Sequence, residues 1–565
     1  MHYANKAHSE MNTSPVDLLI RGATVYDGLG SPGRVADVAV KGGRVVDIGG
    51  TTKTAHSVIE AAGLALMPGI IDVHTHYDAQ VTWDPTLSPS PSLGVTTAVI
   101  GNCGFGIAPC PEPLRETMLE NLSVVEGMDL DALITGTQWQ FESFSEYLDF
   151  VRRQRPYLNV AVYVGHSCIR TAVMGAEAST RKEPTPAELA RMQQLVREAM
   201  NDGAVGFASS FSPNHFGYGG MPMPSTIASD DELRALVGVI GEANKGVFMM
   251  ATGPRATPEL MESLAADTGR PMFISTVLTM YNDAAPERSL TYYERCAEAI
   301  SRGREVFIQT TCQPLSFDFS LLDPYLLLSH DAFDRAKTAG PDELAAIYAD
   351  PAFRARFREN LANPQPGILF FGDWSKVELE GRLISELARE AGKDPLDFFF
   401  DTALERGLHT QFVAKLFQNN DKGVAPLLRH PAGVIALSDA GAHLLYFCDA
   451  GFGLHFLSHW VRETGTFTLE EAVRRLTSDL ASKFRIPDRG RIASGAWADL
   501  LLFDPANVGL SALMRVPDLP GGGARMIRKP HGVAGVWVNG VQVFDGAEYV
   551  KLEGGPGVVL DRFES

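Results

Sequence analysis

Cysteine and long apolar runs are scarce in this chain of 565 residues. Only six cysteines occur, and no two of them form a CxxC pair, which argues against a secreted disulfide scaffold and favours a reducing cytoplasm. No run approaches the roughly 18 uncharged apolar residues of a transmembrane helix. The polar first stretch, MHYANKAHSEMNTSP, lacks the apolar centre of a signal peptide. We therefore expect a cytoplasmic protein with no membrane partner.

Basic residues are also outnumbered. Lys and Arg total 49 against 68 Asp and Glu, which gives a formal net charge of −19. This charge argues against nucleic acid as a partner, because phosphate contacts need a basic face. The apolar and charged fractions, 45% and 21%, are those of an ordinary globular protein. A small-molecule substrate fits this composition, and whether the chain forms a homo-oligomer stays open.

Both ends of the chain have the pattern of β structure. Residues 16–69 and 491–546 contain short apolar or alternating runs between glycine-containing turns, and Asn539-Gly540 is a strong hairpin signal. The pattern predicts one small β domain built from both termini, residues 1–66 together with 490–565.

Between the termini, strands and helices alternate over residues 67–489. Eight short apolar runs are strand candidates, and helical stretches follow several of them, which fits a (β/α)8 barrel. An open doubly wound sheet is the alternative, although no GxGxxG follows an early strand. The eight candidates are residues 68–76, 95–104, 159–167, 204–210, 246–253, 271–277, 304–312 and 433–441. The stretch 282–430 is too long for one βα unit, so part of it is expected to be a mostly helical insertion over the barrel mouth.

The sharpest chemical feature is the pair His74 and His76 in Asp72-Val73-His74-Thr75-His76. Residues i and i+2 of a strand point to the same face, so the two imidazoles are placed side by side, as a divalent metal requires. The C-terminal end of a barrel strand is also where catalytic groups lie. The plainer interpretation is two partly exposed histidines leaving a strand.

Context extends this motif. MPGIIDVHTHYD, residues 67–78, resembles the signature of the amidohydrolase superfamily. Residues 92–109 and 435–443 are similar to blocks of its D-aminoacylase branch, the N-acyl-D-amino-acid deacylases, and residues 490–505 are similar to amidohydrolase tails. The resemblance runs roughly from residue 16 to 545. It implies an α/β fold, namely a metal-bearing (β/α)8 TIM barrel with a small β-sandwich domain formed by both termini, and hydrolysis of an amide bond.

The resemblance also implies two further metal ligands. Cys103 lies in the block Gly101-Asn102-Cys103-Gly104, whose cysteine is a metal ligand in the family, although a free cysteine is more commonly an inert core residue. Asp439 follows the last strand, where the family uses an aspartate as metal ligand and proton acceptor. Taken alone, Asp439 would be interpreted as a turn or helix cap.

Several other residues have side chains suited to a substrate or an oxyanion. His166 is predicted to help stabilise an oxyanion, and each of the others can orient a carbonyl or a carboxylate. Each can equally be a loop residue with satisfied hydrogen bonds. The residues predicted to bind substrate are Tyr77, His215, Arg255 and His443. His455 and His459, one helical turn apart amid Leu, Phe and Trp, are predicted to be packing residues.

Two positions depart from the family pattern. The family has metal-binding histidines after the fifth and sixth barrel strands, where this chain has Gly253 and Thr276. The expected cofactor is therefore Zn²⁺ or another divalent metal, in one or two copies, with one favoured. We expect hydrolysis of a small N-acyl amino acid or related amide. A cyclic amide or lactone hydrolase, or a non-catalytic binding protein with a decayed metal site, are the alternatives.

Overall fold

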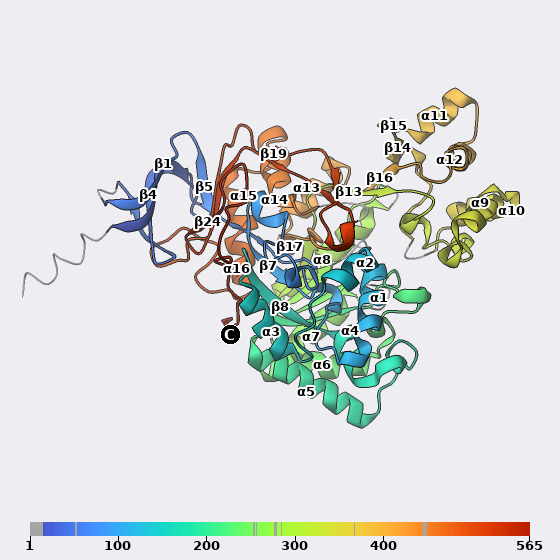
Figure 1. Cartoon of the computed structure of the whole chain (residues 1–565), viewed down its shortest axis with the longest axis horizontal. Helices are drawn as coiled ribbons and strands as arrows, with labels where there is room; N and C mark the ends of the chain where they lie inside the picture. Colours follow the sequence, from blue (N-terminus) through green and yellow to red (C-terminus); the bar gives the residue numbers. More distant parts are fainter. Residues whose placement is uncertain are drawn as a thin grey trace, which may run out of the picture.

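An eight-stranded parallel sheet lies at the centre of the protein (Figure 1). The computed structural model describes residues 15–50, 53–251, 253, 255, 257–275, 279–283, 285–365, 368–444 and 449–564. The strands follow one another in chain order around the sheet. They are β6 (Ile70–Asp72), β7 (Val95–Ile100), β8 (Asn159–Gly165), β9 (Gly206–Ser210), β10 (Val247–Ala251), β11 (Met272–Ser275), β12 (Val306–Thr310) and β17 (Gly433–Ile435).

The first and last strands of this sheet meet. Thr75, just after β6, forms a parallel bridge with Ala440, just after β17. Sequential order and closure are the properties of a barrel, whereas a doubly wound sheet reverses its strand order. The predicted barrel is therefore confirmed, with each strand inside a segment that its apolar run predicted. All residues of β7, β8 and β10 are buried, as expected of parallel strands covered on both faces.

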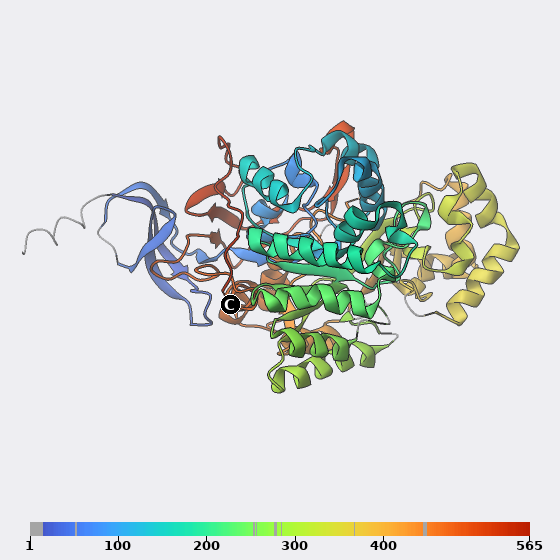
Figure 2. The same cartoon turned by 90° about the horizontal axis from the view of Figure 1, so that it is seen from below.

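Helices cover the outside of the barrel, and Figure 2 shows several of them side by side. Helix α5 (Pro186–Asp202) illustrates why they form where they do. Thr185 and Glu188 make a capping box at its start, and Gly203, with a φ of 113°, ends it. The other main helices of this layer are α3 (Phe144–Gln154), α6 (Asp230–Glu242), α7 (Pro258–Thr268), α8 (Pro286–Ser301), α13 (Asp421–Arg429) and α15 (Leu469–Leu476).

Strands from both termini form a second sheet at one end of the molecule (Figure 1). In that sheet β18, from the C-terminal part, pairs with β5, from the N-terminal part. Leu66, Leu500 and Trp537 share its apolar core, so neither terminus buries its strands without the other. The members are β1 (Val16–Val25), β2 (Arg34–Lys41), β3 (Arg44–Gly49), β4 (Ala55–Glu60), β5 (Ala65–Pro68), β18 (Leu500–Phe503), β23 (Val533–Val538) and β24 (Val541–Phe544).

An insertion between β12 and β17 projects from the opposite end of the molecule (Figure 2). It has a core of its own and carries a four-stranded sheet in addition to the expected helices. Alternating burial along β13 shows why a strand forms there. The insertion contains β13 (Leu315–Phe319), α9 (Pro341–Ala349), α10 (Pro351–Ala362), β14 (Val377–Leu379), β15 (Arg382–Leu383), α11 (Ile384–Ala391), α12 (Pro395–Glu405) and β16 (Phe412–Phe417). In the described part of the chain, no helix combines the length and apolarity needed to cross a bilayer.

Candidate metal centre

The seam between the first and last barrel strands brings together residues from distant parts of the chain. The backbone N–H of Asp439 donates to the carbonyl of His74 over 3.1 Å, and the N–H of His76 donates to the carbonyl of Ala440 over 2.7 Å. The His-x-His segment and the aspartate are thus fixed to each other by main-chain hydrogen bonds. Their side chains share the C-terminal face of the barrel, where catalytic groups lie in this fold.

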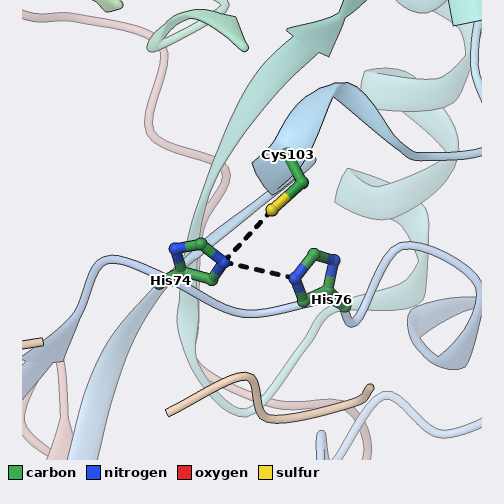
Figure 3. Close-up of side chains that lie close together, drawn as sticks. All are labelled: His74, His76 and Cys103. Atoms are coloured by element: carbon green, nitrogen blue, oxygen red, sulfur yellow. Dashed lines mark hydrogen bonds between the residues drawn. The ribbon is translucent and has the colours of Figure 1, made fainter. Parts of the chain in front are cut away.

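Four donor atoms converge at this seam (Figure 3 shows three of the side chains). Nε2 of His74 lies 3.3 Å from Nε2 of His76 and 3.6 Å from Sγ of Cys103. Oδ1 of Asp439 lies 3.0 Å from Nε2 of His74 and 3.5 Å from Nε2 of His76. The histidines and the cysteine are buried, and the Asp439 side chain is 19% exposed.

These separations fit a tetrahedral zinc ion. Ligand atoms about 2.0–2.3 Å from zinc at tetrahedral angles lie about 3.3–3.6 Å from one another. The group of two imidazole nitrogens and one sulfur, from His74, His76 and Cys103, is also of the type that zinc prefers. These three residues therefore fit one divalent metal ion with an open position, and the Asp439 carboxylate lies beside the two imidazoles.

Two of these residues have left-handed backbone conformations. The φ of Cys103 is 56° and that of Asp439 is 48°, a region that non-glycine residues seldom occupy outside functional sites. Gly101 precedes Cys103 for a steric reason, because a Cβ there would lie 2.6 Å from the carbonyl oxygen of Tyr163. The turn after β7 thus packs tightly while presenting the sulfur.

Sequence reasoning missed the partners behind the two histidines. Oε1 of Glu126, from the segment between α1 (Arg115–Val125) and α2 (Leu130–Gly136), lies 3.1 Å from Nδ1 of His76. Oε1 of Gln309, in β12, lies 2.6 Å from Nδ1 of His74. The Gln309 acceptor places a proton on Nδ1 of His74 and leaves Nε2 free to bind metal, while Glu126 sets a carboxylate beside the ring of His76. A polar residue in the buried strand β12 was a usable signal, whereas nothing in the local sequence distinguishes Glu126.

Acidic groups around the two histidines shift the pKa values at the site. Burial lowers the pKa of His74, but the charges of Asp439 and Cys103 outweigh it and raise the pKa to about 10. Burial acts to raise the pKa of Asp439, but His74 and His76 hold it well below its ordinary value. Asp439 is therefore an anion across the neutral range, as a metal ligand must be.

Gly253 has no room for a side chain. A Cβ at this position would lie 2.0 Å from the carbonyl oxygen of Phe211. The family's histidine thus cannot occupy this backbone. Thr276, the second departure from the family pattern, lies outside the described residues.

His166 has both ring nitrogens engaged. Nδ1 lies 2.8 Å from Oγ of Ser209, and Nε2 lies 2.8 Å from Oε1 of Glu232, which also pairs with Arg170. This buried network ties α4 (His166–Met174) to α6 and leaves neither ring nitrogen for an oxyanion in this conformation.

Tyr77 and Arg255 also point to protein partners. The Tyr77 hydroxyl is buried, 2.6 Å from Oγ of Ser90. The Arg255 guanidinium lies over the Phe211 ring and pairs with Asp230 over 2.7 Å.

His215 and His443 lie close enough to the site to feel its charges. Burial lowers the pKa of His215 to about 4 and lowers that of His443, and both rings interact with the charges of Asp439 and Glu126. Nδ1 of His215 is held by Oγ of Ser210 at 2.7 Å, and the ring of His443 lies 6.0 Å from that of Tyr325 in the insertion. Both rings are therefore neutral near pH 7.

Known proteins with similar sequences and folds cover nearly the whole chain. A D-aminoacylase from Alcaligenes xylosoxydans xylosoxydans is 28% identical over 95% of this chain and 96% of its own length. An N-acyl-D-aspartate deacylase from the same organism is 30% identical over 94% of this chain and 92% of its own length. The crystal structure of N-acyl-D-glutamate deacylase from Bordetella bronchiseptica, complexed with zinc and a phosphonate inhibitor, matches with a TM-score of 0.67 and 26% identity over 97% of this chain and 100% of that chain. The amidohydrolase family model matches residues 57–544. The chain therefore belongs to the amidohydrolase family, and it is similar to the D-aminoacylases of that family.

Proposed function

We propose that this protein hydrolyses the amide bond of a small N-acyl amino acid, with one divalent metal ion, zinc, held by His74, His76 and Cys103 and with Asp439 beside it. The observation that carries this proposal is the convergence of the three donors, next to the Asp439 carboxylate, on the catalytic face of the barrel. The names of the similar proteins, which are deacylases of D-amino-acid derivatives, support the substrate class.

Zinc held by these residues would supply Lewis-acid chemistry and would lower the pKa of a water towards 7. Asp439 is the residue suited to manage the proton. Its carboxylate is anionic, is 19% exposed and lies beside the imidazoles. We assign it the acceptance of the proton from the attacking water at a carboxylate oxygen and its delivery to the leaving nitrogen.

His443 and His215 are proposed to orient the substrate. Because their rings are buried and neutral near pH 7, an N–H donates to a carbonyl or carboxylate oxygen without carrying a full charge into the site. Tyr77, Arg255 and His166 support surrounding loops and helices through the partners described above.

Metal analysis and turnover test the proposal together. Protein purified without added metal should contain about one zinc per chain, and His74→Ala combined with His76→Ala should remove it. Asp439→Asn should retain most of the metal but lower kcat by about 10²–10⁴. Asp267→Asn, at an exposed ion pair with Arg234, is the matched control and should leave both unchanged. A near-normal rate for Asp439→Asn would remove this residue from the mechanism.

Substrate panels separate the alternatives. Turnover should be highest on N-acyl-D-amino acids and low on hydantoins, lactams and lactones. Preference for the cyclic compounds would favour a cyclic amide hydrolase instead. Less than one metal per several chains, with no turnover after zinc addition, would favour a non-catalytic binding protein.

A further inference from the structure

A cavity with none of the four metal donors in its wall lies where the insertion, the barrel and the C-terminal segment meet. Its volume is about 520 Å³, within the range of about 300–1,000 Å³ typical of small-molecule sites. Its wall includes Gln313 after β12, Lys415 of β16, and Arg528 near the C-terminus. It also includes His455 and Arg462, from α14 (Phe452–His455) and the π-helix Phe456–Glu463 that continues it. We call this cavity the basic pocket.

The charge of the basic pocket is opposite to that of the whole chain. Lys415, Arg462 and Arg528 contribute three cations, whereas Glu463 is the one carboxylate among the lining residues. The chain as a whole has a net charge of −19. Because a concave wall of one sign concentrates the local field, the pocket attracts anions that the rest of the surface repels.

The two arginines are held in position by the backbone. Nη1 of Arg462 donates to the carbonyl of Val508, and Nη1 of Arg528 donates to the carbonyl of Ser511 over 3.2 Å. Carbonyl anchors fix a guanidinium without neutralising its charge. Pre-positioned guanidinium groups bind oxyanions with a smaller loss of side-chain entropy.

Glu378 pairs with Lys415 over 2.7 Å, so the charge of the pocket rests on the two arginines, and two other nearby carboxyl groups cancel little of it. Oε1 of Glu463 lies 3.3 Å from Nη2 of Arg462, while its other oxygen is 3.0 Å from the His459 ring. Asp449 lies within electrostatic range of Arg528, but burial raises the pKa of Asp449 to about 8. Near pH 7 the Asp449 carboxyl is therefore mostly protonated.

One buried ring nitrogen of His455 lacks a hydrogen-bond partner within the parts of the chain that the structure describes, which independently indicates a ligand in the pocket. The sequence suggested that His455 and His459 are both packing residues, and His459 is instead paired with Asp421 and Glu463. Nε2 of His455 is buried and has no hydrogen-bond partner among the described residues, although His455 lines the pocket. A buried polar atom without a partner is costly, and an oxyanion accepting from this nitrogen would satisfy it.

We propose that the basic pocket is a binding site for a small oxyanion, a phosphate-bearing or carboxylate-bearing metabolite held by Arg462, Arg528 and His455. The pocket is distinct from the metal centre, and the short segment from Gln309 to Gln313 links the two. Gln313 lines the pocket and Gln309 contacts His74, and four extended residues span at most about 14 Å.

Calorimetric titration of the metal-loaded, full-length protein tests this proposal. Inorganic phosphate and succinate are the probes, with chloride at equal ionic strength as the blank. At least one probe should bind at a single saturable site per chain, and comparison of the two tells phosphate from carboxylate ligands. Arg462→Gln and Arg528→Gln should each weaken binding by about tenfold or more. Arg382→Gln, at an exposed ion pair with Glu390 in the insertion, should bind as wild type does.

A second comparison excludes binding at the metal centre. The double variant His74→Ala, His76→Ala should keep its anion affinity, whereas loss of binding there and retention in the arginine variants would overturn the proposal. Absence of saturable binding by both probes, in titration and in thermal stabilisation, would also overturn it. Thermal unfolding checks that each arginine variant is folded. If one of them is not, Lys415→Gln replaces it in the titration, because the Lys415 side chain lines the pocket and is 45% exposed; it should also weaken binding.

Discussion

Glu126 lies 3.1 Å from Nδ1 of His76, on the opposite side of the imidazole from the metal-binding nitrogen. Burial acts to raise the pKa of Glu126, but the charge of His76 outweighs it and the pKa falls below its ordinary value. The carboxylate is therefore charged and lies beside the Nδ1 edge of the ring. Such partners raise the basicity of a ligating histidine.

Replacing Glu126 by Gln should weaken zinc binding by about 10–100-fold, because the ring loses its charged partner. Competition with a chromogenic chelator measures this affinity. Glu116→Gln, at an exposed position on α1, is the matched control and should have no effect. Equal affinity in the Glu126 and Glu116 variants would show that Glu126 is not needed to position His76.

Gln309 should support His74 in the same way. Gln309→Leu removes the acceptor at 2.6 Å from Nδ1 and should lower zinc affinity by about tenfold or more. Gln309→Glu keeps an acceptor oxygen and should restore most of the affinity. If the Leu and Glu variants bind zinc equally well, the hydrogen bond does not contribute to metal binding.

Gly253 should tolerate no side chain. Gly253→Ala places a Cβ 2.0 Å from a carbonyl oxygen and should destabilise the fold by about 1–3 kcal/mol, seen as a lower Tm. Gly238→Ala, inside α6 with open space around it, should instead gain about 0.5–1 kcal/mol. Restoring the family residue with Gly253→His should likewise lower Tm without adding a second metal. A stable variant with two metals would contradict this prediction.

Asp449 should make stability depend on pH. Burial raises its folded-state pKa to about 8, above the ordinary value of 3.8. Between these two values the carboxyl is deprotonated in the unfolded chain but still protonated in the folded protein. The free energy of unfolding therefore falls by up to about 1.4 kcal/mol per pH unit as pH rises. Asp449→Asn lacks this loss, so its advantage in Tm over wild type should grow from about pH 4 to pH 8. A difference in Tm that is independent of pH would rule out the proposed titration.

Much of the barrel could be predicted from the sequence because its strands are short apolar runs that end in polar or glycine-containing turns. His74 and His76 follow from strand periodicity, and Cys103 and Asp439 from their position at strand ends together with the family blocks. Cytoplasmic location and homo-oligomer formation stay predictions.

Other parts of the site could not be predicted because they depend on tertiary contacts. Glu126 reaches His76 from a segment whose local sequence has no distinguishing pattern. The engagement of His166 depends on Glu232, which lies on another helix. The strands of the insertion, such as β13, do show an alternating pattern, but they are short and lie within a long stretch whose sequence pattern is mainly helical.

The bridge between Thr75 and Ala440 has a consequence for how the protein assembles. The donors on one side of this junction, His74, His76 and Cys103, are synthesised early, whereas Asp439 is synthesised only after the insertion. Closure of the barrel through the main-chain bonds at this seam is therefore what brings the Asp439 carboxylate to the two imidazoles. A chain truncated before Asp439 would lack both the closing strand and the proton acceptor.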